Sequence, residues 1–216
     1  MKKTLYSLML SDDVVRAVDA LAHRMGTNRS ALVNQILAEY TDMVTPERRV
    51  QDIFRQIGEI LGADTDLVPF VAPNAMTMSM KSSLQYRYRP TVKYSVELYR
   101  DREEALGELS VVFRTQSREL LDAMGDFFRL WKQVEDELIA PHKSYATDYA
   151  LYPGRFTRTI ALPGRRDYAT GDVAAAISAY VQLFDRLMKG YLAGNMPPGD
   201  GESEYLEWVR EGNVIL

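Results

Sequence analysis

The 216-residue chain contains no cysteine and only two histidines, His23 and His142. Disulfides and thiolate metal sites are therefore excluded, and two separate histidines offer little material for a transition-metal site. A chain without cysteine fits a reducing compartment, so we expect a cytoplasmic protein with no bound metal and no cofactor. No apolar run approaches the roughly 18 residues of a membrane-spanning helix.

Sequence motifs of the common enzyme classes are also missing. The chain has no glycine-rich phosphate loop, no G-x-S-x-G turn and no H-E-x-x-H motif. Acidic runs such as residues 135–137 are typical of a solvated surface. We therefore expect that the protein is not an enzyme, and an enzyme of unfamiliar type in the C-terminal part remains an alternative.

Positive charge is concentrated near the N-terminus, although the chain as a whole is acidic. The net charge is −4, whereas residues 1–30 hold five Lys and Arg against three Asp, a net charge of +2. An anionic partner such as DNA would be attracted to this part of the chain.

The most informative pattern lies in residues 1–44. Residues 4–10 form a seven-residue segment whose length suits a strand. Ser11 is placed to cap a helix that begins at Asp12, and apolar residues every three or four positions continue this helix to Gly26.

A second helix follows directly and is expected to end near Val44. Its possible caps are Thr27, Asn28 and Ser30. No second strand is predicted within the next 30 or so residues, so the strand at 4–10 lacks a partner for its backbone N–H and C=O groups. Pairing with the same strand of another copy is the simplest solution.

This order of elements resembles the ribbon-helix-helix family of bacterial, archaeal and phage DNA-binding proteins. The resemblance rests on a strand ending in Leu10-Ser11, the helix at 12–25 and the segment GTNRSAL at 26–32. It covers about a fifth of the chain, and residues 76–216 resemble no family. It implies a two-fold homodimer whose antiparallel ribbon enters the major groove of double-stranded DNA.

The resemblance also implies which ribbon residues read DNA. In that family the residue before the first cap faces the core, so Leu10, Leu8 and Tyr6 should be core residues by alternation. The side chains that then face the bases are Lys3, Leu5, Ser7 and Met9.

Two of these positions depart from the polar groove face that is usual in the family. Leu5 and Met9 could contact only a thymine methyl group, so base specificity should be modest or should depend partly on DNA shape. Alternatively, both side chains pack against another part of the protein.

The start of the second helix is expected to clamp a DNA phosphate. The resemblance assigns this role to the free backbone N–H groups together with Thr27, Asn28, Arg29 and Ser30. Simple helix capping is the alternative for Asn28 and Ser30, and both roles can hold together.

The rest of the chain predicts a separate α+β domain. We expect a ribbon-helix-helix domain at 1–45, a third helix and a linker at 46–75, and a C-terminal domain at 76–216. Alternating residues predict antiparallel strands, and two long helices should cover the sheet. The expected strands lie at 81–89, 92–100, 107–116 and 155–163, and the helices begin at Ser117 and Thr170.

Two basic clusters in this domain have open interpretations. The first is either a stacking platform for nucleic acid or an ordinary half-buried strand. The second could bind phosphate or form a solvated face. The first comprises residues 85–89 with Lys93, Tyr94, Tyr99 and Arg100, and the second comprises Arg155, Arg158, Arg165 and Arg166.

The sequence thus predicts a dimeric, sequence-specific DNA-binding transcriptional regulator, most simply a repressor. Its C-terminal domain would bind a small-molecule or protein effector or would mediate further oligomerisation. The alternative is an antitoxin or a plasmid or phage segregation protein, whose C-terminal domain binds a protein partner.

Overall fold

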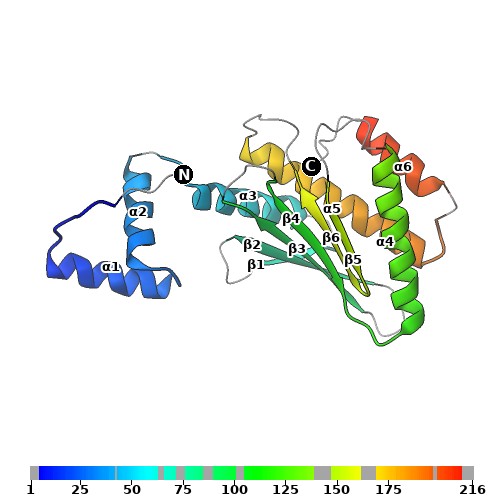
Figure 1. Cartoon of the computed structure of the whole chain (residues 1–216), viewed down its shortest axis with the longest axis horizontal. Helices are drawn as coiled ribbons and strands as arrows, with labels where there is room; N and C mark the ends of the chain where they lie inside the picture. Colours follow the sequence, from blue (N-terminus) through cyan, green and yellow to red (C-terminus); the bar gives the residue numbers. More distant parts are fainter. Residues whose placement is uncertain are drawn as a thin grey trace. The chain divides into compact units, whose positions relative to one another are not determined.

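The computed structural model describes residues 5–41, 43–62, 66–71, 76–84, 90–100, 105–138, 147–161, 169–196 and 199–210. The chain divides into two compact units, Met1–Arg49 and Val50–Leu216. Within the described residues it has six helices and one six-stranded antiparallel sheet, which confirms the α+β class (Figure 1). None of the described helices has the length and apolar character needed to cross a membrane.

The N-terminal unit contains two helices that pack against each other, α1 (Asp12–Arg24) and α2 (Arg29–Tyr40). Helix α1 begins and ends where the sequence predicted. Gly26 has a φ of +62°. The N–H groups of Gly26 and Thr27 donate to the carbonyls of His23 and Ala22. This is a Schellman motif, and glycine adopts its left-handed position without steric cost.

The predicted N-terminal strand is not present in the single chain. Residues 5–11 belong to no strand, and they pair with none of the described strands of their own chain. Tyr6, Leu8 and Leu10, which were expected in the core, are exposed. The physical reason is that a strand needs a second strand to pair its backbone N–H and C=O groups. The six strands of the large sheet pair with one another and do not include residues 5–11.

The larger unit is built on a sheet with the strand order β1-β2-β3-β4-β6-β5. One continuous row across the sheet consists of Pro69, Met80, Tyr94, Val111, Phe156 and Leu151, and it faces the helices. The strands are β1 (Val68–Val71), β2 (Thr77–Ser83), β3 (Thr91–Leu98), β4 (Gly107–Phe113), β5 (Tyr149–Tyr152) and β6 (Arg155–Ile160).

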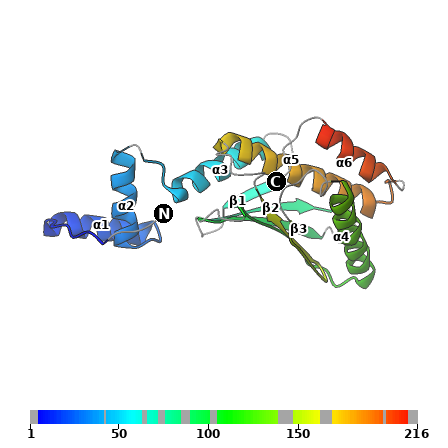
Figure 2. The same cartoon turned by 45° about the horizontal axis from the view of Figure 1, so that its top comes forward.

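The helices of this unit cover one face of the sheet, as Figures 1 and 2 show. Helices α3, α4 and α5 contribute buried apolar side chains to the core, and α6 adds Tyr205 and Trp208. Phe184 of α5 lies at the centre, with ring contacts to Tyr94, Phe127 and Phe156. The helices are α3 (Pro46–Leu61), α4 (Arg118–Leu138), α5 (Thr170–Leu192) and α6 (Asp200–Arg210).

The structure places the boundary between the two parts differently from the predicted linker at 46–75. The apolar face of α3, with Val50, Ile53 and Ile57, belongs to the core of the larger unit. Residues 68–71 form the edge strand β1. The amphipathic pattern of α3 is the reason, because a wide apolar stripe is stable only when it is buried.

Four strands match the predicted segments, with shifted ends. The first begins at Thr77 instead of Lys81, and residues 85–89 of the expected segment lie outside the described residues. Strands β1 and β5 were not predicted. Both are only four residues long, so each offers too few alternating positions for a recognisable period.

Candidate functional site

The N-terminus of α2 is the predicted phosphate site, and its geometry begins with Asn28. The Asn28 side-chain oxygen accepts a hydrogen bond from the Ala31 N–H at 2.9 Å. Asn28 is therefore the cap of α2, as the capping alternative proposed. No partner within the described residues occupies the N–H groups of Arg29 and Ser30, which precede the first intrahelical bond. The helix start thus keeps two donors for an anion.

Arg29 is held by the first helix and does not extend freely into solvent. Its Nε donates to Asp19 Oδ1 at 2.6 Å, and Nη2 donates to Asp19 Oδ2. This hydrogen bonding lowers the pKa of Asp19 and raises the pKa of Arg29. These two hydrogen bonds from the Arg29 guanidinium hold the start of α2 against α1. They leave Nη1 as the arginine donor for an outside anion.

The predicted base-facing residues all lie in or before the segment that forms no strand. Lys3 lies outside the described residues. Leu5, Ser7 and Met9 are exposed, and the side chains of Leu5 and Met9 are almost completely so. Leu5 and Met9 therefore do not pack against the helices of the N-terminal unit.

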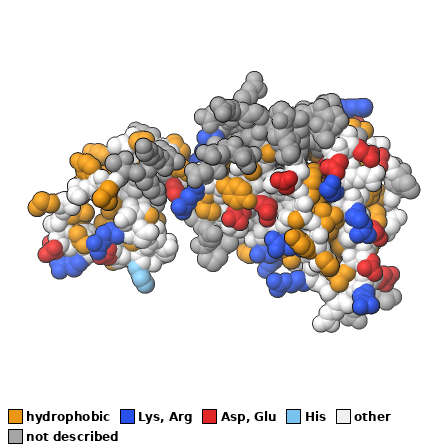
Figure 3. Space-filling view, in the orientation of Figure 1, with side chains coloured by type: hydrophobic (Ala, Val, Ile, Leu, Met, Phe, Trp, Pro, Cys, Tyr) orange, Lys and Arg blue, Asp and Glu red, His pale blue; other side chains and the backbone are white. Residues whose placement is uncertain are grey.

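The N-terminal unit leaves most of its large apolar side chains exposed. The only buried apolar residues described between 5 and 49 are Ala22 and Leu32. Of the sixteen exposed large apolar side chains in the described residues, twelve belong to this unit, so the unit does not bury its apolar surface by itself (Figure 3). They are Leu5, Tyr6, Leu8, Met9, Leu10, Val14, Met25, Ile36, Leu37, Tyr40, Met43 and Val44.

A second polar cluster lies inside the larger unit, where sequence reasoning did not expect it. Glu135 and Arg158 form an ion pair at 2.8 Å, and their side chains are 0% and 1% exposed. The predictions of a solvated acidic run at 135–137 and of a surface role for Arg158 are therefore wrong at these two positions. Arg158 shares the inward face of β6 with Phe156 and Ile160, two residues away on either side.

Two tyrosines add hydrogen bonds to the carboxylate of this ion pair. Tyr149 donates to Glu135 Oε2, and Tyr205 donates to Oε1 at 3.0 Å. The Arg158 guanidinium lies 4.6 Å from the ring centre of Tyr180. Burial acts to lower the pKa of Arg158, but the charge of Glu135 raises it well above its usual value.

The buried cluster joins four elements, and its two charged side chains are buried. It connects α4, β5, β6 and α6 through the two oxygens of one carboxylate. Because Glu135 already accepts from three donors and is fully buried, it is not available as a general base for a substrate. The role of the cluster is to pair two buried charges and to anchor α6 to the core.

Of the remaining candidate residues, one lies in the core and several lie outside the described residues. Tyr94 is buried and donates to Asp185 at 2.8 Å, so it does not belong to a surface stacking platform. Residues 85–89, Arg165 and Arg166 lie outside the described residues. In the described part of the chain, no group of three or more His, Asp or Glu is arranged to hold a metal ion.

The comparisons with known proteins identify no relative. No family model, no curated protein and no solved structure matches the chain. The functional argument therefore depends on the geometry of the chain itself.

Proposed function

We propose that the protein is a dimeric, sequence-specific double-stranded DNA-binding regulator of transcription that acts in the cytoplasm. A repressor is its simplest form, because occupation of a promoter is enough to exclude polymerase. Residues 5–10 of two copies would pair into an antiparallel ribbon, the ribbon-helix-helix arrangement, and enter the major groove. The larger unit would serve as a regulatory or oligomerisation domain.

The observation that carries this proposal is the incomplete burial of the N-terminal unit. A chain segment that exposes twelve large apolar side chains gains free energy by burying them, at about 25 cal/mol per Å² of apolar surface. The exposed side chains come from the N-terminal segment and from both helices. A second copy offers the same apolar residues and the same unpaired segment at residues 5–10, so a two-fold pairing would bury both sets.

The start of α2 supports an anionic ligand. Asn28 orders the first turn, the N–H groups of Arg29 and Ser30 are available, and Arg29 retains one nitrogen beyond its contact with Asp19. The hydroxyls of Thr27 and Ser30 add polar groups at the same helix end. A DNA phosphate satisfies these donors, and two copies of the site would set the register of a dimer on the duplex.

The test is selection of duplexes with a randomised centre by the full-length protein, followed by fluorescence anisotropy on the enriched duplex. We expect enrichment of a two-fold symmetric sequence and an affinity that falls steeply with salt. Deletion of residues 1–10 should abolish retention, and Ser30→Ala combined with Arg29→Ala should weaken it on all sequences. Arg16→Ala, which removes an exposed arginine paired with Asp13 on α1, serves as the matched control.

Two results would contradict the proposal. One is a full-length chain that enriches no duplex, and the other is a chain without residues 1–10 that retains the duplex as well as the complete protein. A monomer that captures no DNA would instead favour the alternative of an antitoxin or segregation protein with a protein partner.

A further inference from the structure

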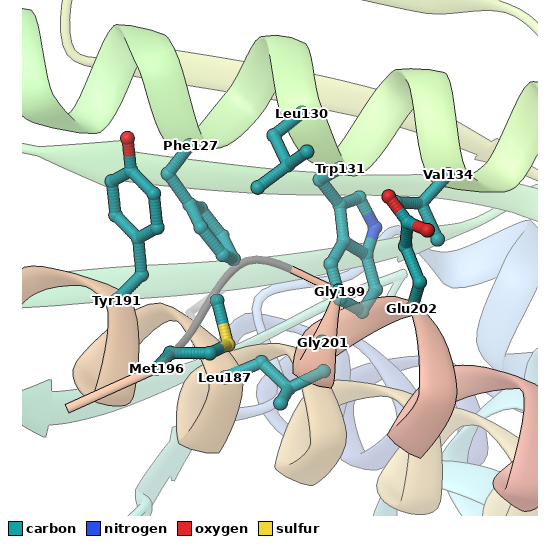
Figure 4. Close-up of a pocket in the computed structure, with 10 residues that line it drawn as sticks. All are labelled: Phe127, Leu130, Trp131, Val134, Leu187, Tyr191, Met196, Gly199, Gly201 and Glu202. Atoms are coloured by element: carbon teal, nitrogen blue, oxygen red, sulfur yellow. The ribbon is translucent and has the colours of Figure 1, made fainter.

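An apolar cavity of about 280 Å³ lies in the larger unit between α4, α5 and the start of α6. Its walls carry three aromatic side chains, Phe127, Trp131 and Tyr191 (Figure 4). The volume is nearly twice that of an apolar protein cavity of about 150 Å³ that takes up benzene. The cavity therefore has room for a ring and a short substituent.

The aromatic walls are held rigidly by the core behind them. The Trp131 indole N–H donates to the Tyr180 hydroxyl at 2.8 Å, and its ring meets Phe184 and Tyr205 edge to face. Phe127 contacts Phe184 at a centroid distance of 5.4 Å. Because these rings have partners on their inner sides, the cavity keeps its shape without a ligand.

Helix α6 closes one side of the cavity. Tyr205 anchors α6 to Glu135, and Arg186 of α5 pairs with Glu204. Met196 lines the cavity with its flexible thioether, and a Cβ atom on Gly201 would lie only 3.1 Å from the Met196 sulfur. The glycine thus leaves space for Met196, whose side chain can adjust to the outline of a ligand.

A single charged side chain lines this apolar cavity. Glu202 lies in the first turn of α6, and in Figure 4 its carboxylate lies beside the Trp131 ring and Val134. Tyr191 and Phe127 lie toward the other end of the cavity. Within the described residues Glu202 takes part in no hydrogen bond or ion pair. Its negative charge next to an aromatic face is the environment that binds an organic ammonium group.

We propose that this cavity is a binding site for a small hydrophobic cation. Its ammonium group lies between the Glu202 carboxylate and the Trp131 face, and its apolar body extends along Phe127 toward Met196. Apolar burial supplies most of the affinity, and the carboxylate discriminates between charge types. This binding does not depend on the DNA-binding proposal, because every contact lies within the larger unit.

The experiment is calorimetric titration of the full-length protein with three probes of similar size. These are benzyltrimethylammonium, which is cationic, benzyl alcohol, which is neutral, and phenylacetate, which is anionic. We expect saturable binding of one benzyltrimethylammonium per chain, about tenfold tighter than benzyl alcohol, since a cation gains both the aromatic face and the carboxylate. Phenylacetate should bind most weakly.

Three variants separate the site from the rest of the surface. Glu202→Gln should lower the affinity for the cation about tenfold and leave benzyl alcohol unchanged, because it removes only the charge. Glu207→Gln, an exposed position on the same helix outside the cavity, should change neither affinity. Leu130→Trp, which fills the cavity from the half-buried face of α4, should abolish both.

The proposal is overturned by any of three results. These are absence of saturable binding of the cation, equal affinities for the cationic and neutral probes, and an equal loss of affinity for the cation in Glu202→Gln and Glu207→Gln.

Discussion

The two units of this chain both contain helices rich in apolar side chains but reach very different degrees of burial. In the larger unit, α4 and α5 bury wide apolar stripes around Phe184, and the core continues through the sheet. In the N-terminal unit, α1 and α2 bury only Ala22 and Leu32. An amphipathic pattern therefore shows that a face must be covered, but it does not show which chain covers it.

The size of the units explains this difference. A segment of about 50 residues can bury only a modest fraction of its surface, so it commonly depends on association, a metal or disulfides. This chain has no cysteine, so a disulfide cannot stabilise the N-terminal unit, whereas the proposed dimer would.

The largest expected effect is the loss of the dimer when the N-terminal unit is removed. A chain that begins at Thr45 keeps the cap of α3, because the Thr45 hydroxyl accepts from the Arg48 N–H at 3.2 Å. We expect the full-length protein to sediment as a dimer and the shortened chain to sediment as a monomer that still unfolds cooperatively. Analytical ultracentrifugation and urea denaturation measure the two properties.

Point variants of the full chain sharpen the same prediction. Leu37→Ser should weaken dimerisation by at least about tenfold, since burial of a leucine contributes about 1.5–3 kcal/mol and a two-fold dimer contains two copies of it. Val68→Ser, at an exposed aliphatic position of the larger unit, should leave it unchanged. A dimer that survives in the shortened chain would show that the larger unit carries the association.

Disruption of the buried ion pair should have the next largest effect, a loss of unfolding free energy. Glu135→Met or Arg158→Met leaves one buried charge without its partner, which costs about 3–5 kcal/mol of unfolding free energy. The double variant should lose clearly less than the sum of the single losses, because it leaves no unpaired charge. Urea denaturation of the wild type, the two single variants and the double variant provides a double-mutant cycle. Single losses that simply add up in the double variant would argue against the ion pair.

Disruption of the exposed Asp19–Arg29 pair in the N-terminal unit should have the smallest effect on stability. Hydrogen bonding to Arg29 lowers the pKa of Asp19 in the folded state. The contribution of this pair to folding stability is therefore fully present at pH values above the ordinary aspartate pKa. It is lost as the pH falls through the lowered value. Arg29→Ala should raise the pKa of Asp19 toward its ordinary value, as carboxyl NMR would measure, without a detectable change in the urea midpoint. An unchanged pKa would mean that the contact is not populated in solution.

The sequence predicted most helices well because their signals are local. Asp12 and Gly26 bound α1 as expected, and α5 begins at Thr170 as expected. The inward faces of β3 and β4, including Val96 and Val111, also follow from simple alternation. The cap at Asn28 depends on a residue three positions away, so it too could be predicted from the sequence.

The features that sequence reasoning missed depend on contacts between distant segments. Arg158 and Glu135 are 23 positions apart, and nothing local shows that two charged residues will pair inside a core. The phase of β6 offered one signal, because Arg158 alternates with Phe156 and Ile160 on the inward face. The contact of Arg29 with Asp19 likewise requires the turn at Gly26 to bring two helices together.

The two outer strands of the sheet direct where another strand can be added. β1 and β5 are four residues long, and Pro69 in β1 has no N–H to donate to a neighbour. Short borders of this kind make poor templates for extending a sheet. Growth of the sheet into a longer assembly is therefore disfavoured at both borders, and the segment at residues 5–10 remains the longer stretch of backbone open to such pairing.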